Sequence, residues 1–312
     1  MKEAKDLRII FMGTPDFAVS SLDAICKAGY QVAGVITAPD RPAGRGMKLT
    51  ESAVKKYAVE HGLHILQPLK LKDPEFLNEL RSLNADLQIV VAFRMLPEMV
   101  WNMPPMGTVN LHGSLLPQYR GAAPINWAII NGERETGVTT FKLKQEIDTG
   151  DILMQEKFPI GKNETFGEVH DRMKEIGATV LVQTIDGLVK GSLQEIPQSS
   201  IATESLKSAP KIFTDHCRID WSKSVQDIHN LVRGLSPVPG AFTSFQGKMF
   251  KIYRSEIEDA STHEETGSFK SDGKTFLKFA CKDGYLVVKE LQMEGKKKMP
   301  VEDFLRGYKI NQ

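Results

Sequence analysis

The segment NLHGSLLPQYRG, residues 110–121, carries an amide and an imidazole two positions apart on an expected strand. Side chains at that spacing on a strand point to the same face, so Asn110 and His112 would lie together. The Asn110 amide can donate a hydrogen bond to a carbonyl oxygen that gains negative charge, and the His112 ring can accept or release a proton near neutral pH. The pair could therefore catalyse group transfer at a carbonyl. The alternative is that both side chains only satisfy backbone groups of the following loop.

A carboxylate that could assist His112 stands in the segment QEIDTGD, residues 145–151. Asp148 precedes a Thr-Gly pair, and this composition is typical of a turn. From such a turn a carboxylate could orient an imidazole and stabilise its charged form. Asp151 is a rival for this role, and the spacing does not choose between the two. A structural role as a turn cap is the alternative for either residue.

A basic loop follows the second expected strand. The segment APDRPAGRGMKL, residues 38–49, holds Arg41, Arg45 and Lys48 together with two prolines and two glycines. Such a loop could bind phosphate, carboxylate or nucleic acid. It could also be an ordinary exposed loop, but its position at the end of a strand, where ligands bind in sheets of this type, favours a function.

The elements that must position these segments alternate between strands and helices in the front half of the chain. The expected strands are residues 7–12, 31–37, 64–66, 86–93, 108–111 and 136–143. The expected helices are residues 17–26, 51–61, 74–83 and 165–190. Apolar strands separated by helices predict an α/β fold, namely a Rossmann-like, doubly wound, mainly parallel sheet with helices on both faces. Ligands bind beyond the carboxyl ends of the strands in such sheets, where the basic loop and the His112 loop begin.

The pattern changes near residue 191. Residues 191–210 are polar, with two prolines and several serines, and are typical of a linker. A helix at residues 224–233 and four short β-type runs separated by turn signals follow, which predicts a small antiparallel barrel or sandwich. We therefore expect a catalytic domain over residues 1–190, a linker over 191–206 and a C-terminal β-barrel domain over 207–312.

The composition is that of a globular protein and excludes disordered, fibrous and membrane-spanning classes. The 312 residues are 41% hydrophobic and 25% charged, and no apolar run approaches the roughly 18 to 20 residues that cross a bilayer. Three widely spaced cysteines without a CxxC pair predict a reduced, cytoplasmic protein. No GxGxxG, GxxxxGK[ST], HExxH or GxSxG motif occurs, and no His and Cys spacing indicates a metal site. Residues 206–312 hold 18 Lys and Arg against 14 Asp and Glu, a balance that permits a polyanionic partner.

Eight segments together resemble the methionyl-tRNA formyltransferase family over nearly the whole chain. They are LRIIFMGTPDFAV, PDRPAGRGMKL, QPLKL, ADLQIVVAF, NLHGSLLPQYRGAAPINWAI, ETGVTT, IDTGD and IDWSKSVQDIHNLVRGLSPVPGAF. The Asn-x-His-x-Ser-Leu-Leu-Pro core with a downstream Asp-x-Gly resembles folate-dependent formyltransferases in general. The GTPDF start, the PDRPAGRG loop and the C-terminal domain narrow the resemblance to the tRNA enzymes. The chain departs from the family in AFRMLP, residues 92–97, where Arg94 replaces small residues near the folate pocket.

This resemblance implies transfer of a formyl group from 10-formyltetrahydrofolate to the α-amino group of methionyl initiator tRNA, for translation initiation. It also implies a formyltransferase fold with an OB-like C-terminal barrel. Position by position, Asn110, His112 and Asp148 match the family's catalytic trio. The stretch that contacts folate in the family matches Ser114, Leu115, Leu116 and Pro117.

The resemblance implies a tRNA-binding role for the basic loop. Arg45 matches the loop arginine tied to the acceptor end of the tRNA, and we expect Arg41 and Lys48 of the same loop to bind the tRNA as well. The implied reaction needs no metal, and we expect a monomer without membrane contact. One rival is a formyltransferase for a small amine, such as an aminosugar nucleotide or glycinamide ribonucleotide. Another is a non-catalytic tRNA- or folate-binding module, against which the intact trio argues.

Overall fold

The computed structural model describes residues 6–43, 47–201, 205–261 and 263–309, so the expected tRNA-binding Arg45 lies outside the described residues. The chain forms two compact units, each assembled from three stretches. The first, which we call the sheet unit, comprises residues 1–120, 137–157 and 171–207. The second, which we call the barrel unit, comprises residues 121–136, 158–170 and 208–312. The expected domain limits at residues 190 and 206 stay a prediction.

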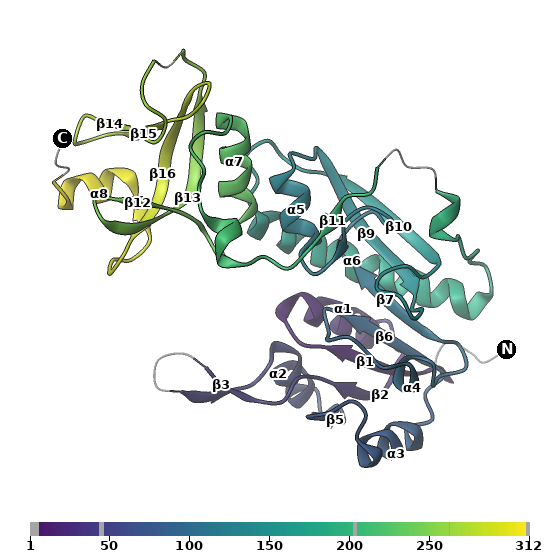
Figure 1. The fold of residues 1–312 in the computed structure, drawn as a ribbon. Helices are drawn as coiled ribbons and strands as arrows, with labels where there is room; N and C mark the ends of the chain where they lie inside the picture. Colours follow the sequence, from purple (N-terminus) through teal and green to yellow (C-terminus); the bar gives the residue numbers. More distant parts are fainter. Residues whose placement is uncertain (1–5, 44–46, 202–204, 262, 310–312) are drawn as a thin grey trace. The chain divides into compact units, whose positions relative to one another are not determined.

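A seven-stranded sheet in the order β10-β9-β7-β6-β1-β2-β5 forms the centre of the front half of the chain (Figure 1). Its strands are β1 (Arg8–Gly13), β2 (Gln31–Ile36), β5 (Ile65–Leu66), β6 (Leu87–Val91), β7 (Thr108–His112), β9 (Glu135–Lys142) and β10 (Ile152–Pro159). The pairs β1-β2, β1-β6, β2-β5 and β6-β7 are parallel, and β9 runs antiparallel to β7. The expected α/β fold with a mainly parallel sheet is confirmed.

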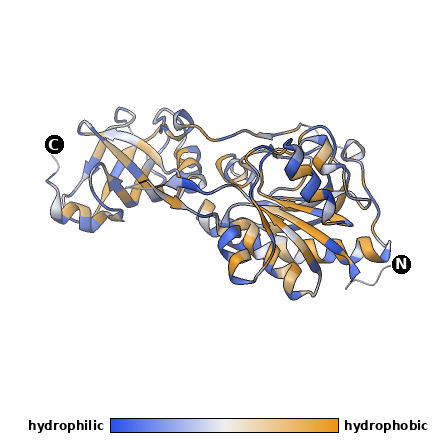
Figure 2. Ribbon diagram, turned by 90° about the horizontal axis from the view of Figure 1, so that it is seen from below, coloured by the Kyte–Doolittle hydropathy of each residue, from blue (hydrophilic) through white to orange (hydrophobic). Residues whose placement is uncertain are grey.

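Helices pack on both faces of this sheet, because its strands are apolar on both sides (Figure 2). They are α1 (Asp16–Lys27), α2 (Ala53–Glu60), α3 (Pro74–Ser82), α4 (Glu98–Trp101) and α6 (Phe166–Lys190). On one face Ile10, Met12 and Val90 pack with apolar side chains of α3 and α4. On the other face Leu111 lies against α6, where a side chain at Gly177 would come within 2.9 Å of it. Two layers of helices therefore hold the strands that carry Asn110 and His112.

The expected basic loop contains a short hairpin. Strand β3 (Arg41–Ala43) pairs antiparallel with β4 (Lys48–Thr50). We call these two strands the basic hairpin. The sequence predicted a loop because proline and glycine are rare inside strands, yet two three-residue strands can pair locally.

The barrel unit contains a curled antiparallel sheet in the order β12-β13-β16-β15-β14, with β17 beside β16. Its strands are β12 (Ala241–Phe245), β13 (Lys248–Glu258), β14 (Phe269–Ser271), β15 (Leu277–Ala280), β16 (Tyr285–Met293) and β17 (Met299–Pro300). The sheet forms a half-barrel that is consistent with an OB-like fold, so the expected small barrel is confirmed in this form. Helices α7 (Val225–Gly234) and α8 (Val301–Gly307) pack with its core, where Phe250, Phe279 and Phe304 meet.

Several short elements were not predicted from the sequence. Strand β10 was missed because polar residues interrupt its apolar run, and helix α5 (Pro124–Ile130) because its seven residues are too few for a periodic pattern. Helices α4 and α8 and strands β14 and β17 were also not predicted. The same holds for strands β8 (Arg120–Gly121) and β11 (Ser208–Ala209) and the 3₁₀ turns η2 (Gln198–Ser200) and η3 (Thr214–Cys217). Among the residues that the structure describes, no helix is both long and apolar enough to cross a membrane.

Candidate active site

Strand β7 brings Asn110 and His112 to the carboxyl end of the sheet. The two side chains share a face with Thr139 and Phe141 of β9, because Asn110 pairs with Phe141 and His112 pairs with Thr139. His112 is 7% exposed and Asn110 is partly exposed. The juxtaposition expected from their spacing is present, and it lies at the sheet edge where ligands bind in this fold class.

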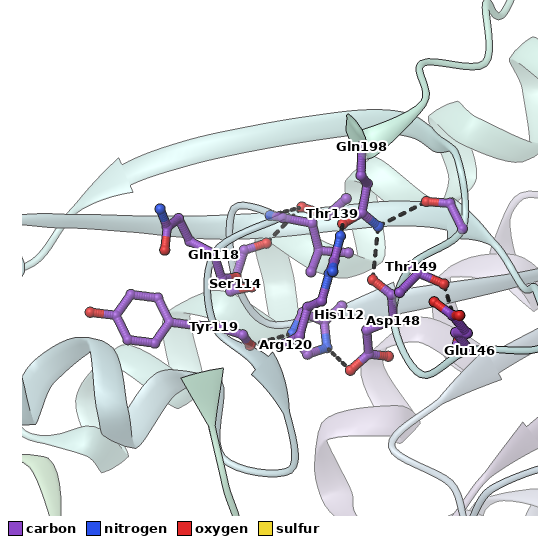
Figure 3. Close-up of polar contacts among 12 residues, drawn as sticks. His112, Ser114, Gln118, Tyr119, Arg120, Thr139, Glu146, Asp148, Thr149 and Gln198 are labelled. Carbon is purple, nitrogen blue, oxygen red and sulfur yellow. Dashed lines mark hydrogen bonds and ion pairs between the residues drawn. The ribbon is translucent and has the colours of Figure 1, made fainter. Parts of the chain in front are cut away.

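The His112 ring has a polar partner on each side (Figure 3). Its Nε2 lies 2.9 Å from the Tyr119 carbonyl oxygen, and its Nδ1 lies 3.8 Å from Oδ2 of Asp148. Because a carbonyl only accepts hydrogen bonds, Nε2 carries the donating proton. In the neutral ring Nδ1 is then the atom that can accept a proton, and it faces a carboxylate.

The Asp148 turn is held by its own backbone and by a buried glutamine. Asp148 has a left-handed backbone with φ of 54°, which Asp tolerates better than most residues. A side chain at Gly150 would lie 1.6 Å from the Lys142 carbonyl oxygen, so only glycine fits there. The Gln198 amide donates to the carbonyls of Asp148 and Gly150, each at 2.8 Å. These contacts fix the direction in which the carboxylate leaves the turn.

Gln198 belongs to a buried hydrogen-bond network that the sequence did not predict. It is 4% exposed, and its Oε1 accepts hydrogen bonds from the Arg120 guanidinium at 2.6 and 3.0 Å (Figure 3). Arg120 directly follows Tyr119, whose carbonyl holds His112. This network therefore links the loop after β7 to the Asp148 turn. Gln198 lies in the segment expected to be a linker, and no local pattern marks it.

The two rival carboxylates occupy different environments. Asp151 lies 2.8 Å from the Lys144 ammonium, whereas Asp148 faces His112, although both carboxylates are largely buried. Geometry therefore favours Asp148 over Asp151 as the partner of the imidazole.

The loop after His112 is rigid and largely buried. The Thr139 hydroxyl donates to the Ser114 carbonyl at 2.6 Å and accepts from the Leu116 N–H at 3.1 Å. The Ser114 hydroxyl donates to the Gln118 carbonyl at 2.6 Å. Ser114, Leu116 and Pro117 are buried, and Leu115 is partly exposed. Their side chains shape the loop, so contact with a ligand there would fall mainly to backbone atoms and Leu115.

The structure places only part of the expected tRNA-binding group. Arg41 is exposed on the basic hairpin, and Lys48 lies in its second strand. Burial, with repulsion from Arg41 as the second cause, lowers the pKa of the Arg94 guanidinium. Arg41 thus lies near Arg94. No contact joins Arg41 to the expected trio within the described residues.

A cavity of about 420 Å³ lies beside the segment that follows β6. It is lined by Leu71, Lys72, Arg94, Met95, Leu96, Pro97 and Glu98. Arg94 donates to the Leu69 carbonyl at 3.0 Å and also to the Pro68 carbonyl. Because β6 and β7 are parallel neighbours, this segment starts from the same sheet edge as the His112 loop. Among the described residues no cluster of three or more His, Cys, Asp or Glu side chains could hold a metal ion.

Comparison with known sequences places the chain among formyltransferases. Residues 7–185 match the formyl transferase family, and residues 211–309 match the formyl transferase C-terminal domain. A methionyl-tRNA formyltransferase of Parabacteroides distasonis is 55% identical over 98% of this chain and 97% of its own length. Another, from Phocaeicola vulgatus, is 55% identical over 99% of this chain and 98% of its own length.

Solved structures share the fold at low sequence identity. The N-formyltransferase of Helicobacter canadensis, in complex with folinic acid and dTDP-3-aminofucose, has a TM-score of 0.68 and 21% identity over 94% of this chain and 100% of its own. HypX of Aquifex aeolicus, in complex with tetrahydrofolic acid, has a TM-score of 0.64 and 19% identity over 98% of this chain and 48% of its own. This chain thus spans about half the length of HypX.

Proposed function

The chain belongs to the methionyl-tRNA formyltransferase family, and on that premise we propose that Asn110, His112 and Asp148 carry out its chemistry. The protein transfers a formyl group from 10-formyltetrahydrofolate to the α-amino group of methionyl initiator tRNA, which prepares that tRNA for translation initiation. The observation that carries the assignment of roles is the 3.8 Å approach of Asp148 Oδ2 to His112 Nδ1, on the strand that also presents Asn110.

His112 takes the proton that the attacking amine must lose. An α-amino group has a pKa of about 7.7, so it is partly protonated at neutral pH and attacks only when neutral. Because Nε2 donates to the Tyr119 carbonyl, the ring accepts the proton at Nδ1, and the Asp148 carboxylate stabilises the resulting imidazolium. The proton then passes to N10 of the departing folate as the bond between N10 and the formyl carbon breaks. Proton transfer of this kind contributes about 10²–10⁴ in rate.

Asn110 stabilises the negative oxygen of the tetrahedral intermediate. That charge develops on the formyl oxygen when the amine nitrogen bonds to the formyl carbon. The Asn110 side chain is partly exposed at the edge of the sheet, so its N–H groups can reach that oxygen. A single preorganised donor of this type contributes about 10²–10³ in rate.

The folate would lie along the rigid loop of residues 114–117 and the cavity beside β6. The cavity combines apolar side chains, such as Leu96, with the cationic groups of Lys72 and Arg94. 10-Formyltetrahydrofolate pairs a flat pterin with a glutamate tail that carries carboxylates, so this mixture of linings suits it. Arg94 is part of the cavity wall, where the Leu69 carbonyl accepts a hydrogen bond from its guanidinium.

The tRNA would bind to the basic hairpin and to the barrel unit. The sequence of residues 41–50 includes Arg41, Arg45 and Lys48, and residues 206–312 carry a net positive charge. Contacts of Lys and Arg with phosphates release counterions, so the affinity for tRNA should fall steeply as salt is raised.

We also propose that the protein acts in the cytoplasm as a monomer and that its functional division follows residues 1–190, 191–206 and 207–312. Cys26, Cys217 and Cys281 are free thiols, which suits a reducing compartment. Sedimentation of the purified protein over a range of concentrations tests the monomer. Microscopy of a tagged chain in its own host tests the compartment.

A transfer assay with competing acceptors tests the function. The full chain is incubated with 10-formyltetrahydrofolate and methionyl initiator tRNA, and separately with a dTDP-aminosugar or glycinamide ribonucleotide. We expect formylation of the tRNA alone. If the protein formylated a small amine in preference to the tRNA, the proposed acceptor would be wrong. If it bound both substrates without turnover, it would be a binding module and not an enzyme.

A further inference from the structure

A group of exposed and half-buried rings on the barrel unit has no part in the reaction described above. It consists of Trp127, Phe213 and His216 with the Lys211 ammonium beside them, and we call it the aromatic cluster. The Phe213 side chain is 58% exposed, whereas Cys217, four residues later, is buried in the core of the unit. The His216 ring centroid lies 5.6 Å from that of Trp127, at an interplanar angle of 76°, and 6.0 Å from that of Phe213, at 49°.

Hydrogen bonds hold two of the three rings, those of His216 and Trp127. The Phe213 N–H donates to His216 Nδ1 at 3.0 Å, so the proton of the neutral His216 ring sits on Nε2. The Trp127 indole N–H donates to the Pro210 carbonyl at 2.7 Å. The Lys211 Nζ lies 5.7 Å from the centre of the Phe213 ring. The cluster therefore presents aromatic faces and a cation, and its indole donor is already used.

We propose that the aromatic cluster stacks an unpaired nucleobase from the single-stranded 3′ end of the tRNA, an inference that rests on the function proposed above. Aromatic rings stack on any nucleobase, and a neighbouring cation attracts the backbone phosphate; proteins bind single-stranded nucleic acid through this combination. The charge near the rings suits a nucleic acid. Residues 211–218 hold two cationic side chains, Lys211 and Arg218, and one carboxylate, Asp215.

Only a short stretch of chain separates the cluster from a residue that is bonded to the loop after His112. The Tyr119 N–H donates to the Lys207 carbonyl at 2.7 Å, and the Tyr119 carbonyl accepts from His112. Phe213 follows Lys207 by six residues, which span at most about 22 Å of extended backbone. The aminoacyl group that must reach His112 is attached to the single-stranded 3′ end of the tRNA. The unpaired bases of that end are therefore the bases that the cluster can meet.

Fluorescence of 2-aminopurine in the tRNA tests the stacking. One unpaired 3′ base at a time is replaced by 2-aminopurine, whose emission is quenched on stacking, and the full chain is titrated against each tRNA. We expect quenching at one position by the unaltered protein and by Phe213→Tyr. Phe213→Ala should abolish the quenching and raise Kd roughly 5- to 100-fold. Met249→Ala, which truncates another exposed side chain of the barrel unit, should leave both readings unchanged.

Salt dependence separates stacking from charge. Phe213→Ala should leave the slope of log Kd against log salt unchanged, whereas Lys211→Gln should reduce it by about 1. Quenching retained in Phe213→Ala, or affinity lost without a change in emission at any unpaired base, would overturn the inference. Self-association that depends on Phe213 while tRNA binding does not would assign the surface to a second copy of the chain. If the protein formylates methionyl-tRNA but quenches 2-aminopurine at no position, the stacking inference is wrong and the proposed function stands. If the protein does not formylate the tRNA, the proposed function itself is wrong.

Discussion

The carboxylate of Asp148 faces Nδ1 of His112 at 3.8 Å, on the opposite side of the ring from the Tyr119 carbonyl that accepts from Nε2. That separation is longer than a hydrogen bond, so the carboxylate acts chiefly on the charge of the ring. The tautomer is set by Tyr119 instead. The two tasks that a single carboxylate performs in a Ser-His-Asp triad are thus divided between a backbone carbonyl and a side chain.

The first prediction concerns the charge of Asp148. We expect Asp148→Asn to lower kcat by about 10²–10⁴, because the imidazolium that forms on proton transfer loses its counter-charge. Asp151→Asn is the matched control, since Asp151 pairs with the exposed Lys144 instead of His112, and this variant should keep nearly normal kcat. Initial rates at saturating tRNA and folate provide the comparison. An equal loss of kcat in the two variants would show that Asp148 has no specific role in the mechanism.

The second prediction concerns Asn110. We expect Asn110→Ala to lower kcat by about 10²–10³ while KM for both substrates changes little, because the lost donor acts on charge that exists only in the transition state. Asn78→Ala, in an exposed position of α3, should behave like the unaltered protein. Thermal unfolding of both variants would show that the fold is intact. A rise in KM at constant kcat would make Asn110 a binding residue.

The third prediction concerns Gln198, which positions Asp148. Gln198→Ala removes two hydrogen bonds to the Asp148 turn and leaves the Arg120 guanidinium without its acceptor. We expect a fall in kcat and a loss of about 1–3 kcal/mol in the free energy of unfolding. Gln198→Glu should also lose kcat, because a carboxylate keeps the Arg120 contact but cannot donate to the turn. Gln226→Ala, exposed on α7, is the control. Normal turnover in Gln198→Glu would show that the turn needs no such support.

Much of the sheet could be predicted because its strands are short apolar runs bounded by polar or glycine residues. The run LQIVV of β6 is buried on both faces, so the sequence marks it without help from distant residues. The pairing of Asn110 with His112 also follows from a local rule, the two-residue period of a strand. The family resemblance then selected Asp148, and the geometry agrees with that choice over Asp151.

The missing parts depend on contacts between distant residues. Gln198 donates to a turn 48 to 50 residues earlier, and no local pattern records such a contact. The segment around it is polar and contains proline, so it was expected to be a linker, although it packs across the Asp148 turn. Strand β10 gains its place by lying beside β9 rather than from its own polar sequence. Such partners are specified by the whole fold.

The fourth prediction concerns Arg94, where the chain departs from its family. We expect Arg94→Ala to raise KM for 10-formyltetrahydrofolate by about 10- to 100-fold, because a charged hydrogen-bonding group is lost from the cavity wall. The value of kcat should stay within about threefold, since the residue takes no part in proton transfer. Arg81→Ala, exposed on α3, is the control. A change in KM for the tRNA and not for the folate would show that Arg94 binds the tRNA.

The last prediction concerns acid stability and His229 of the barrel unit. Burial, with repulsion from Arg233 as the second cause, lowers the pKa of His229 from 6.5 to about 4, and its Nδ1 lies 2.9 Å from the Ser255 hydroxyl. Between those two pH values His229 is protonated in the unfolded chain and neutral in the folded chain. The free energy of unfolding should therefore decrease as pH falls from 6.5 towards 4, by roughly 3 kcal/mol in all.

Substitution of His229 separates its effect from that of the carboxylates, which also titrate in acid. His229→Gln keeps a polar partner for Ser255 and cannot be charged, so its unfolding free energy should fall less between pH 6.5 and pH 4 than that of the unaltered protein. Chemical denaturation at several pH values across this window measures the difference, with the solvent-exposed His263→Gln as the control. Parallel curves for His229→Gln and the unaltered protein would mean that His229 takes up its proton without unfolding the unit.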